Sequence, residues 1–291
     1  MHSCTLAYDA TPRLCLHTPE PAARGHRYGH ALTEGLSSPA GLHRRPWLAR
    51  LRRALDEDRF EVHYQPIVSL ADGRAAHYEA LVRLADERSG ALVAPGRFLP
   101  AAERYGLIRE IDRLVLDRVA RLLGGRGRGG ARVAVNMSAL SVTDPTMLAH
   151  IERSLRHHGV DPGRLVIEIT ETAAIHDMDR ALRFCEGLAG LGCAIALDDF
   201  GAGFGSFQYL SLPFDYLKID GGFIRELPSS PTDQLVVQAL VGLARGMGTQ
   251  TIAEYVTDRA TLQLLRGYGV DYAQGFELGR PHPQVPFAAS A

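Results

Sequence analysis

Short apolar runs typical of β-strands alternate with helix-like segments along most of this 291-residue chain. Eight such runs are readable, at residues 60–68, 77–84, 132–138, 164–170, 193–199, 215–220, 249–254 and 271–278. Strands alternating with helices over about 240 residues predict an α/β fold, specifically a (β/α)8 TIM-like barrel. A doubly wound open sheet is the structural alternative, but no glycine-rich dinucleotide-binding turn follows the first strands, which disfavours it.

The two ends of the chain lack this alternation. Residues 1–44 carry Pro, Gly, Ser and His without sustained periodicity, so we expect a short, loosely ordered N-terminal extension. The barrel is then expected over residues 45–285, with a C-terminal tail at 286–291. Histidines and cysteines in the extension match no standard zinc spacing, so we do not predict a metal site there.

The composition excludes several classes of protein. With 46% hydrophobic and 22% charged residues, the chain is typical of a soluble globular protein. A formal net charge of -1 creates no global field that would attract duplex nucleic acid or anionic lipid. The apolar runs are too short to span a membrane, no signal peptide is visible, and the four cysteines form no disulfide framework. We therefore expect a cytoplasmic protein.

Polar residues lie at or near the ends of seven of these strand-like runs. They are Glu79, Asn136, Glu168, Asp198, Lys218, Glu254 and Gln274. In a parallel barrel these ends open onto one face, where the active sites of such barrels lie. Acidic residues often end strands because loops begin there, but that explanation accounts poorly for seven polar groups, four of them carboxylates.

A cluster of this kind predicts a metal site. Asp199 and Asp220 add two further acids, and so many carboxylates repel one another unless a multivalent cation neutralises them. Carboxylate and amide oxygens suit Mg²⁺ or Mn²⁺ better than zinc. The ligands suffice for two ions, which is an arrangement used for in-line displacement at phosphorus.

Lys218 is the only lysine in a chain that otherwise uses arginine for its basic residues. Two neighbouring cations would lower the pKa of this amine, and the neutral amine could accept a proton from the attacking water. Arginine cannot be deprotonated in a protein. The alternative is that an arginine-rich composition left one lysine here by chance.

Two further features fit a phosphorylated substrate. Arg83 follows Glu79 on the same strand-like run and could bind a phosphate through its planar guanidinium, although a lone arginine is more often part of a surface ion pair. The glycine-rich segment 200–213 joins two strand ends of the predicted site. It is either a mobile lid or a flexible connector.

Taken together, these residues resemble the EAL-domain family of cyclic di-GMP phosphodiesterases over residues 58–284. The signature is "YEALVR" at 78–83, and the matching motifs in order are "YQPIV" (64–68), "FLPAAERYGLI" (98–108), "NMS" (136–138), "EITE" (168–171), "DDFGAGFGSF" (198–207), "LKID" (217–220), "AEYV" (253–256) and "QGF" (274–276).

The resemblance implies hydrolysis of cyclic di-GMP to linear pGpG at a site with two Mg²⁺ or Mn²⁺ ions, in a protein that forms a homodimer. It implies the metal ligands Glu79, Asn136, Glu168, Asp198, Asp199 and Glu254. Lys218 matches the general base, and Glu254 and Gln274 complete the catalytic set. Gln65, Leu81, Arg83 and Asp220 match substrate-binding positions, and Glu171 matches a residue that stabilises the glycine-rich loop.

One position departs from the family pattern. Where the family often has Glu-Gly-Val-Glu, this chain has Glu254-Tyr-Val-Thr257, so the second glutamate is replaced by Thr257. Loss of that carboxylate could weaken metal binding or slow turnover. A catalytically weak EAL domain that binds cyclic di-GMP as a receptor is therefore the alternative function. An unrelated barrel metalloenzyme of the enolase type is disfavoured by the order of the motifs.

Overall fold

The computed structural model describes residues 45–125, 132–170, 177–201 and 206–285. The expected extension at 1–44 and tail at 286–291 lie outside the described residues, as does Glu171. No helix in the described part of the chain is long and apolar enough to cross a membrane.

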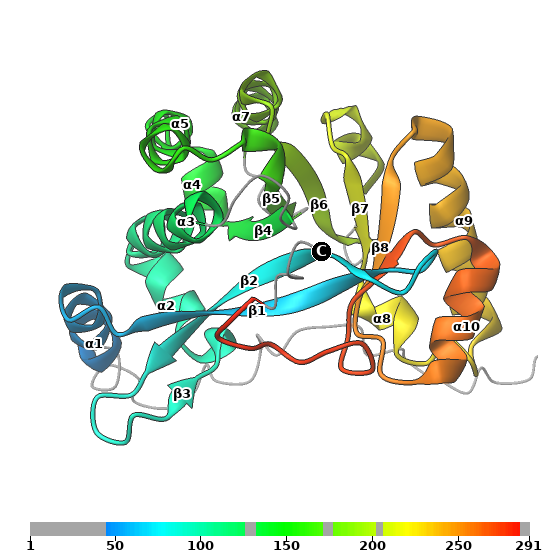
Figure 1. Ribbon diagram of the computed structural model, residues 1–291, viewed down its shortest axis with the longest axis horizontal. Helices are drawn as coiled ribbons and strands as arrows, with labels where there is room; N and C mark the ends of the chain where they lie inside the picture. Colours follow the sequence, from blue (N-terminus) through cyan, green and yellow to red (C-terminus); the bar gives the residue numbers. More distant parts are fainter. Residues whose placement is uncertain (1–44, 126–131, 171–176, 202–205, 286–291) are drawn as a thin grey trace, which may run out of the picture. The chain divides into compact units, whose positions relative to one another are not determined.

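Eight strands close into a barrel, and a ninth extends its edge (Figure 1). The sheet runs in the order β1-β9-β8-β7-β6-β5-β4-β2-β3, and β1 also pairs with β2 to close it. The strands are β1 (Phe60–Ser69), β2 (Ala75–Ala85), β3 (Leu92–Val93), β4 (Arg132–Met137), β5 (Leu165–Thr170), β6 (Ala194–Phe200), β7 (Tyr216–Ile219), β8 (Gln250–Ala253) and β9 (Tyr272–Ala273). The predicted TIM-like barrel is therefore confirmed.

Strand β1 departs from the all-parallel arrangement that the sequence suggested. It pairs antiparallel with both β2 and β9, whereas β2 and β4 to β9 pair parallel in succession. The physical reason is the short connection after Ser69, because a few residues can form only a hairpin and a parallel pair needs a long crossover. Alternation of apolar residues does not encode strand direction.

Helices cover the outside of the barrel (Figure 1). The α-helices are α1 (Arg45–Asp56), α2 (Leu99–Arg104), α3 (Ile108–Gly124), α4 (Ala139–Val142), α5 (Met147–His158), α7 (Met178–Leu191), α8 (Gly221–Ile224), α9 (Pro231–Met247) and α10 (Arg259–Tyr268). Capping explains several of their boundaries. Helix α9, for example, begins after Ser230, whose side chain accepts a hydrogen bond from Asp233 N, and ends at Gly248 in the left-handed conformation.

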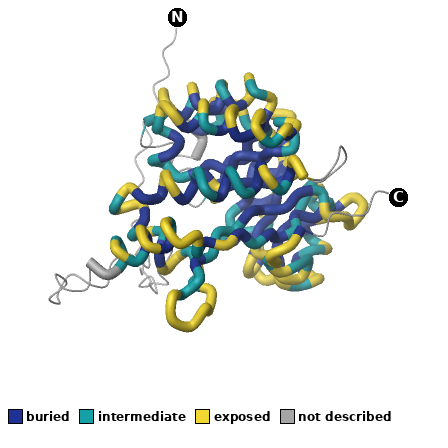
Figure 2. Tube along the Cα trace, turned by 60° about the vertical axis from the view of Figure 1, so that its left-hand side comes forward, coloured by how far each residue is buried: buried dark blue, intermediate teal, exposed yellow. Residues whose placement is uncertain are grey.

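The strands form the buried centre of the molecule, and the helices expose their outer faces (Figure 2). Inside the barrel, one layer of side chains closes the end opposite the strand carboxyl termini. This inner layer consists of Ile67, His77, Ala134, Val166, Ala196, Tyr216, Ile252 and Tyr272. The rings of His77 and Tyr216 meet edge to face with centroids 4.9 Å apart. The site is built directly on this layer.

Candidate active site

A ring of eight polar side chains lies next to the inner layer, each on a barrel strand or, for Glu254 and Gln274, directly after one. Successive side chains on a strand point to opposite faces, so a residue two positions along from an inner-layer residue also points into the barrel. The members of this polar ring are Gln65, Glu79, Asn136, Glu168, Asp198, Lys218, Glu254 and Gln274. All seven predicted strand-end residues belong to it, and β1 contributes the eighth, Gln65, by running in the opposite direction.

Glu79 reaches this ring because β2 leaves the parallel sheet early. Its pairing with β4 covers only His77 to Ala80, while its pairing with β1 continues to Leu84. Glu79 therefore lies at the end of the barrel part of β2, although it is near the middle of the strand.

Lys218 lies at the centre of the carboxylates. Its Nζ is 2.9 Å from Glu168 Oε2 and 2.9 Å from Asp198 Oδ1, and it is 2.8 Å from Glu254 Oε1. Only 1% of the lysine is exposed, so these ion pairs are formed out of contact with bulk water. Strands β5, β6, β7 and β8 are consecutive in the sheet, which is why their four side chains converge.

A second chain of hydrogen bonds joins the other half of the polar ring. Asn136 Nδ2 donates to Glu79 Oε1 at 2.7 Å, and Gln274 Nε2 donates to Glu79 Oε2 at 2.6 Å. Gln274 Nε2 also lies 3.3 Å from Gln65 Oε1, and Gln65 donates to Gly279 O. These bonds fix the orientation of Glu79, because both of its carboxylate oxygens have donors.

The arrangement fits a divalent cation. Oxygen atoms of Asp198, Asp199 and Glu254 all lie within 4.8 Å of one another. Glu168 Oε1 is buried and has no hydrogen-bond partner among the described residues, so this carboxylate keeps one oxygen for a further ligand. Hard oxygen donors of this kind suit Mg²⁺ or Mn²⁺. The chemistry of these donors is therefore compatible with the predicted metal site.

The charges in this cluster are not balanced by the lysine alone. Burial raises the pKa of Glu254 to about 8, although Lys218 beside it acts in the opposite direction. Burial likewise raises the pKa of Glu168 well above its ordinary value. Burial alone would lower the pKa of Lys218, but the surrounding carboxylates raise it well above its ordinary value. Lys218 is thus an ammonium in this state, and its neutral form beside bound cations stays a prediction.

A cavity of about 970 Å³ opens beside the polar ring. It is lined by Glu79, Leu81 and Asn136 on the strand side and mainly by apolar residues of α2 and α3 on the other. Asp112 of α3 is, besides Glu79, a second buried charged residue in the lining. Ser138 Oγ and Ser141 Oγ each donate to Asp112 Oδ2 at 2.6 Å. No hydrogen bond to its Oδ1 is found in the described part of the chain.

Sequence reasoning missed Asp112. Burial raises the pKa of its carboxyl to about 6, against the hydrogen bonds from Ser138 and Ser141. A signal was present, because Asp112 falls on the apolar stripe of α3, four residues after Ile108 and four before Leu116. An acid on a buried stripe requires either a polar partner or a role at a cavity.

The remaining predicted residues lie at or beyond the edge of the polar ring. Asp220 follows β7 and caps α8 by accepting from Gly222 N at 2.8 Å. Asp199 is the last but one residue of β6 and adopts the left-handed region, with a φ of 55°. Arg83 is half-buried on β2, and its Nη1 donates to Val82 O. Thr257 is exposed between β8 and α10.

The fold and the polar ring define an α/β-barrel protein with a candidate metal centre at the carboxyl ends of its strands. The profile of the EAL domain matches residues 48–281, which is more than half of the chain. This chain belongs to the EAL domain family, and the predicted resemblance is confirmed.

Individual relatives agree with this assignment. The chain is 38% identical over 244 residues to the bifunctional diguanylate cyclase/cyclic di-GMP phosphodiesterase MucR of Pseudomonas aeruginosa, covering 82% of this chain and 36% of that protein. It is 35% identical over 244 residues to the cyclic di-GMP phosphodiesterase PdeB of Shewanella oneidensis, covering 83% of this chain and 28% of the relative. The chain thus spans about a third of the length of these curated relatives.

Solved structures share the fold. A MucR phosphodiesterase structure in complex with c-di-GMP has a TM-score of 0.77 at 38% identity, covering 81% of this chain and 97% of that one. The FimX EAL domain of Pseudomonas aeruginosa bound to c-di-GMP has a TM-score of 0.78 at 30% identity, covering 84% of this chain and 100% of that one.

Proposed function

We propose that this domain hydrolyses cyclic di-GMP to linear pGpG in a metal-dependent reaction. The observation that carries the proposal is Lys218, a buried amine within 2.9 Å of three carboxylates. Membership of the EAL domain family and relatives named cyclic di-GMP phosphodiesterases support it.

Two divalent cations, Mg²⁺ or Mn²⁺, are the proposed cofactors. The residues that would hold them are Glu79, Asn136, Glu168, Asp198, Asp199 and Glu254. Bound cations would neutralise these carboxylates, activate the attacking water and stabilise the charge that develops on the phosphoryl oxygens. The buried Glu168 Oε1 without a partner and the close oxygens of Asp198, Asp199 and Glu254 support this ligand set.

Lys218 would act as the general base. Once the carboxylates around it are neutralised, the attraction that keeps its proton is removed, and burial favours the neutral amine. The amine takes a proton from the water as the water oxygen bonds to phosphorus. The bond between phosphorus and the 3′ oxygen breaks, and this oxygen leaves and takes up a proton from solvent water, while Lys218 later releases its extra proton to solvent. The product carries a 5′ phosphate and a free 3′ hydroxyl, and Gln274 would orient the water.

The cavity beside the polar ring would bind the dinucleotide. Its apolar wall suits the face of a purine, and Asp112 offers a buried carboxylate oxygen. Guanine presents adjacent N–H donors on its Watson–Crick edge, so a carboxylate acceptor is complementary to it. Leu81 lines the same cavity, and Arg83 lies two residues further along β2, where it would bind phosphate. Gln65 and Asp220 are the other proposed substrate contacts.

The second candidate is a catalytically weak receptor for cyclic di-GMP. The observation that favours it is Thr257, which replaces a family carboxylate near the predicted metal ligand Glu254. A receptor would keep the binding cavity and lose metal-dependent turnover.

One experiment distinguishes these functions. The purified protein is incubated with cyclic di-GMP and Mn²⁺, and pGpG is followed by chromatography, with EDTA as the control. We expect product only with the metal. Lys218→Arg keeps the positive charge but cannot accept a proton, so it should bind the nucleotide and lose most turnover. Tight binding without product in the unmodified protein supports the receptor instead, and a near-normal rate in the arginine variant refutes the base assignment.

Several finer predictions remain proposals of their own. They are the division into an extension, a barrel at 45–285 and a tail, the homodimer, the cytoplasmic location, and the stabilisation of the segment 200–213 by Glu171. Light scattering of the purified protein tests the dimer, limited proteolysis tests the boundaries, and cell fractionation tests the location. A Glu171→Gln variant with normal metal-dependent turnover would contradict the role given to that residue.

A further inference from the structure

The strand that carries Leu81 and Arg83 is held from outside the barrel by helix α1. After Ala80, strand β2 has lost its pairing with β4, and its described partners are β1 and, at its last two residues, β3. This end of β2 therefore projects from the barrel. Whatever fixes it also fixes the position of Arg83 relative to the polar ring.

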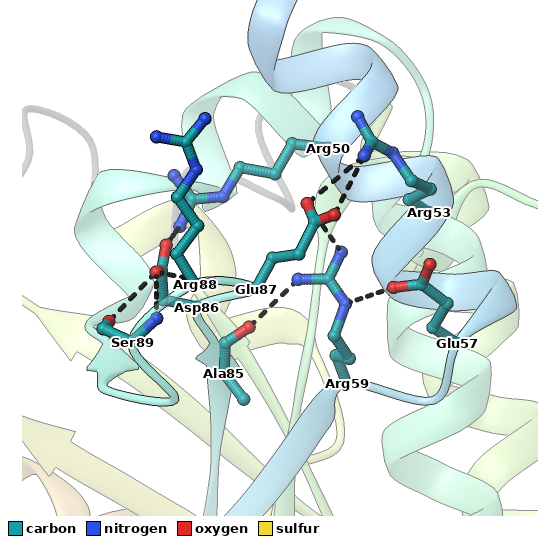
Figure 3. A network of polar contacts seen from close by, with 9 residues as sticks. All are labelled: Arg50, Arg53, Glu57, Arg59, Ala85, Asp86, Glu87, Arg88 and Ser89. Atoms are coloured by element: carbon teal, nitrogen blue, oxygen red, sulfur yellow. Dashed lines mark hydrogen bonds and ion pairs between the residues drawn. The ribbon is translucent and has the colours of Figure 1, made fainter.

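Helix α1 is docked firmly enough to serve as an anchor. Leu51 and Ala54 are completely buried, and Trp47 and Leu48 pack against the same core. Two arginines of the helix, Arg50 and Arg53, reach the turn that joins β2 to β3 (Figure 3). The helix thus has one face in the core and another on this turn.

Ion pairs connect the helix to the turn. Arg50 Nη2 lies 2.5 Å from Asp86 Oδ2, and Arg53 Nη1 lies 3.0 Å from Glu87 Oε1 (Figure 3). Arg59, between α1 and β1, donates to Ala85 O and comes within 3.9 Å of Glu87 Oε2. We call Arg50, Arg53, Arg59, Asp86 and Glu87 the hairpin clamp. The Arg50 and Asp86 side chains are 29% and 27% exposed, so their ion pair is only partly screened by water.

Asp86 is the central member of the hairpin clamp, because its two carboxylate oxygens bind different partners. While Oδ2 binds Arg50, Oδ1 accepts hydrogen bonds from Arg88 N, Ser89 N and Ser89 Oγ (Figure 3). The same carboxylate therefore shapes the turn and ties it to α1. Asp86 comes three residues after Arg83 and directly follows the last residue of the same strand.

We propose that Asp86 is a positioning residue, which together with Arg50 holds the end of β2 so that Arg83 and Leu81 meet the dinucleotide. This inference rests on the proposed function. Among the described residues, neither Asp86 nor Arg50 has a hydrogen bond or ion pair with a member of the polar ring, so the effect passes through the backbone of β2. Loss of the ion pair should weaken binding of ground state and transition state equally, which raises KM and leaves kcat unchanged.

The test compares Arg50→Gln and Asp86→Asn with the unmodified protein. The asparagine keeps an acceptor for the turn but removes the charge that binds Arg50. A partly exposed ion pair of this kind predicts a rise in KM for cyclic di-GMP of roughly threefold, with kcat unchanged. A calorimetric Kd for cyclic di-GMP in EDTA should rise by the same factor. Arg50→Lys keeps the charge and should restore most of the affinity.

Arg52→Gln is the matched control, since this arginine lies on the exposed side of α1 outside the hairpin clamp. It should leave KM and Kd unchanged. If the Arg50→Gln and Asp86→Asn variants lower Tm but keep the wild-type KM and Kd, the ion pair has a merely structural role. That result would overturn this inference and leave the proposed function standing. An unmodified protein that neither binds nor hydrolyses cyclic di-GMP would overturn the proposed function as well.

Discussion

Replacing Lys218 by methionine would leave three carboxylates around a position that no longer carries a positive charge. The methionine fills a similar volume, so the main change is electrostatic. In the unmodified protein the amine lies within 2.9 Å of Glu168, Asp198 and Glu254 and is 1% exposed. We therefore expect the metal-free variant to be much less stable than the metal-free parent.

The size of this loss follows from the burial. Removing one partner of a buried ion pair costs about 3–5 kcal/mol. The lower end applies here, because burial already raises the pKa of Glu254 to about 8 and uptake of protons relieves part of the repulsion. For a domain of this size, about 3 kcal/mol corresponds to a fall in Tm of roughly 6–12 °C.

Thermal unfolding in EDTA at pH 8 measures this effect. Saturating Mn²⁺ should restore most of the lost Tm, because the cations replace the missing positive charge. A matched double variant, Lys218→Met with Glu168→Gln, removes one of the unpaired carboxylates and should be more stable than the single variant. The reasoning is refuted if the single variant unfolds within about 2 °C of the parent in EDTA, or if the Glu168 change makes it less stable still.

Three further outcomes follow. Thr257→Glu should lower the Mn²⁺ concentration at half-maximal pGpG formation by about tenfold, and an unchanged midpoint would show that Thr257 is not the cause of any weakness. Burial raises the pKa of Asp112 from 3.8 to about 6, so its contribution to stability is present below pH 3.8 and is lost as pH rises through 6. Compared with Asp112→Asn in urea unfolding, the unmodified protein should therefore gain roughly 2–3 kcal/mol from pH 7.5 to pH 4, and a pH-independent difference would contradict this. Mn²⁺ at about a hundred times its Kd should raise Tm by roughly 5–11 °C. Asp199 lies beside Asp198 and Glu254, so the Asp199→Asn variant should show a smaller rise in Tm at the same Mn²⁺ concentration. An equal rise in Tm would exclude Asp199 as a ligand.

Most of the site could be predicted from the sequence because it depends on the two-residue alternation of side chains along a strand. Residues two apart on a strand share a face, so Ala196 and Asp198 or Tyr216 and Lys218 had to point the same way. Once eight strands were recognised, the polar residues near their ends had to meet. Lys218 was identified in addition by being the only lysine of the chain.

The rest depends on contacts that a linear pattern does not contain. The direction of β1 and the early departure of β2 from the parallel sheet are set by pairing between strands, so Gln65 could be assigned only through the family resemblance. Asp112 was overlooked because the helical period served only to identify α3. It also shows that an acidic residue lies on the apolar stripe of that helix, which indicates a buried carboxylate. The hairpin clamp joins residues more than thirty positions apart, such as Arg50 and Asp86, whose meeting requires the folded chain.

The inner layer of the barrel has a consequence for exchange with solvent. With Ile67, Tyr216 and Ile252 each no more than 2% exposed and His77 wedged between two tyrosine rings, the end of the barrel below the polar ring is plugged. Under the proposed function, nucleotide, cations and water would then enter and leave through the same mouth. A molecule bound in that mouth would prevent others from entering or leaving. Linear product should therefore compete with incoming substrate. A cation bound beneath a nucleotide should exchange only after the nucleotide has left.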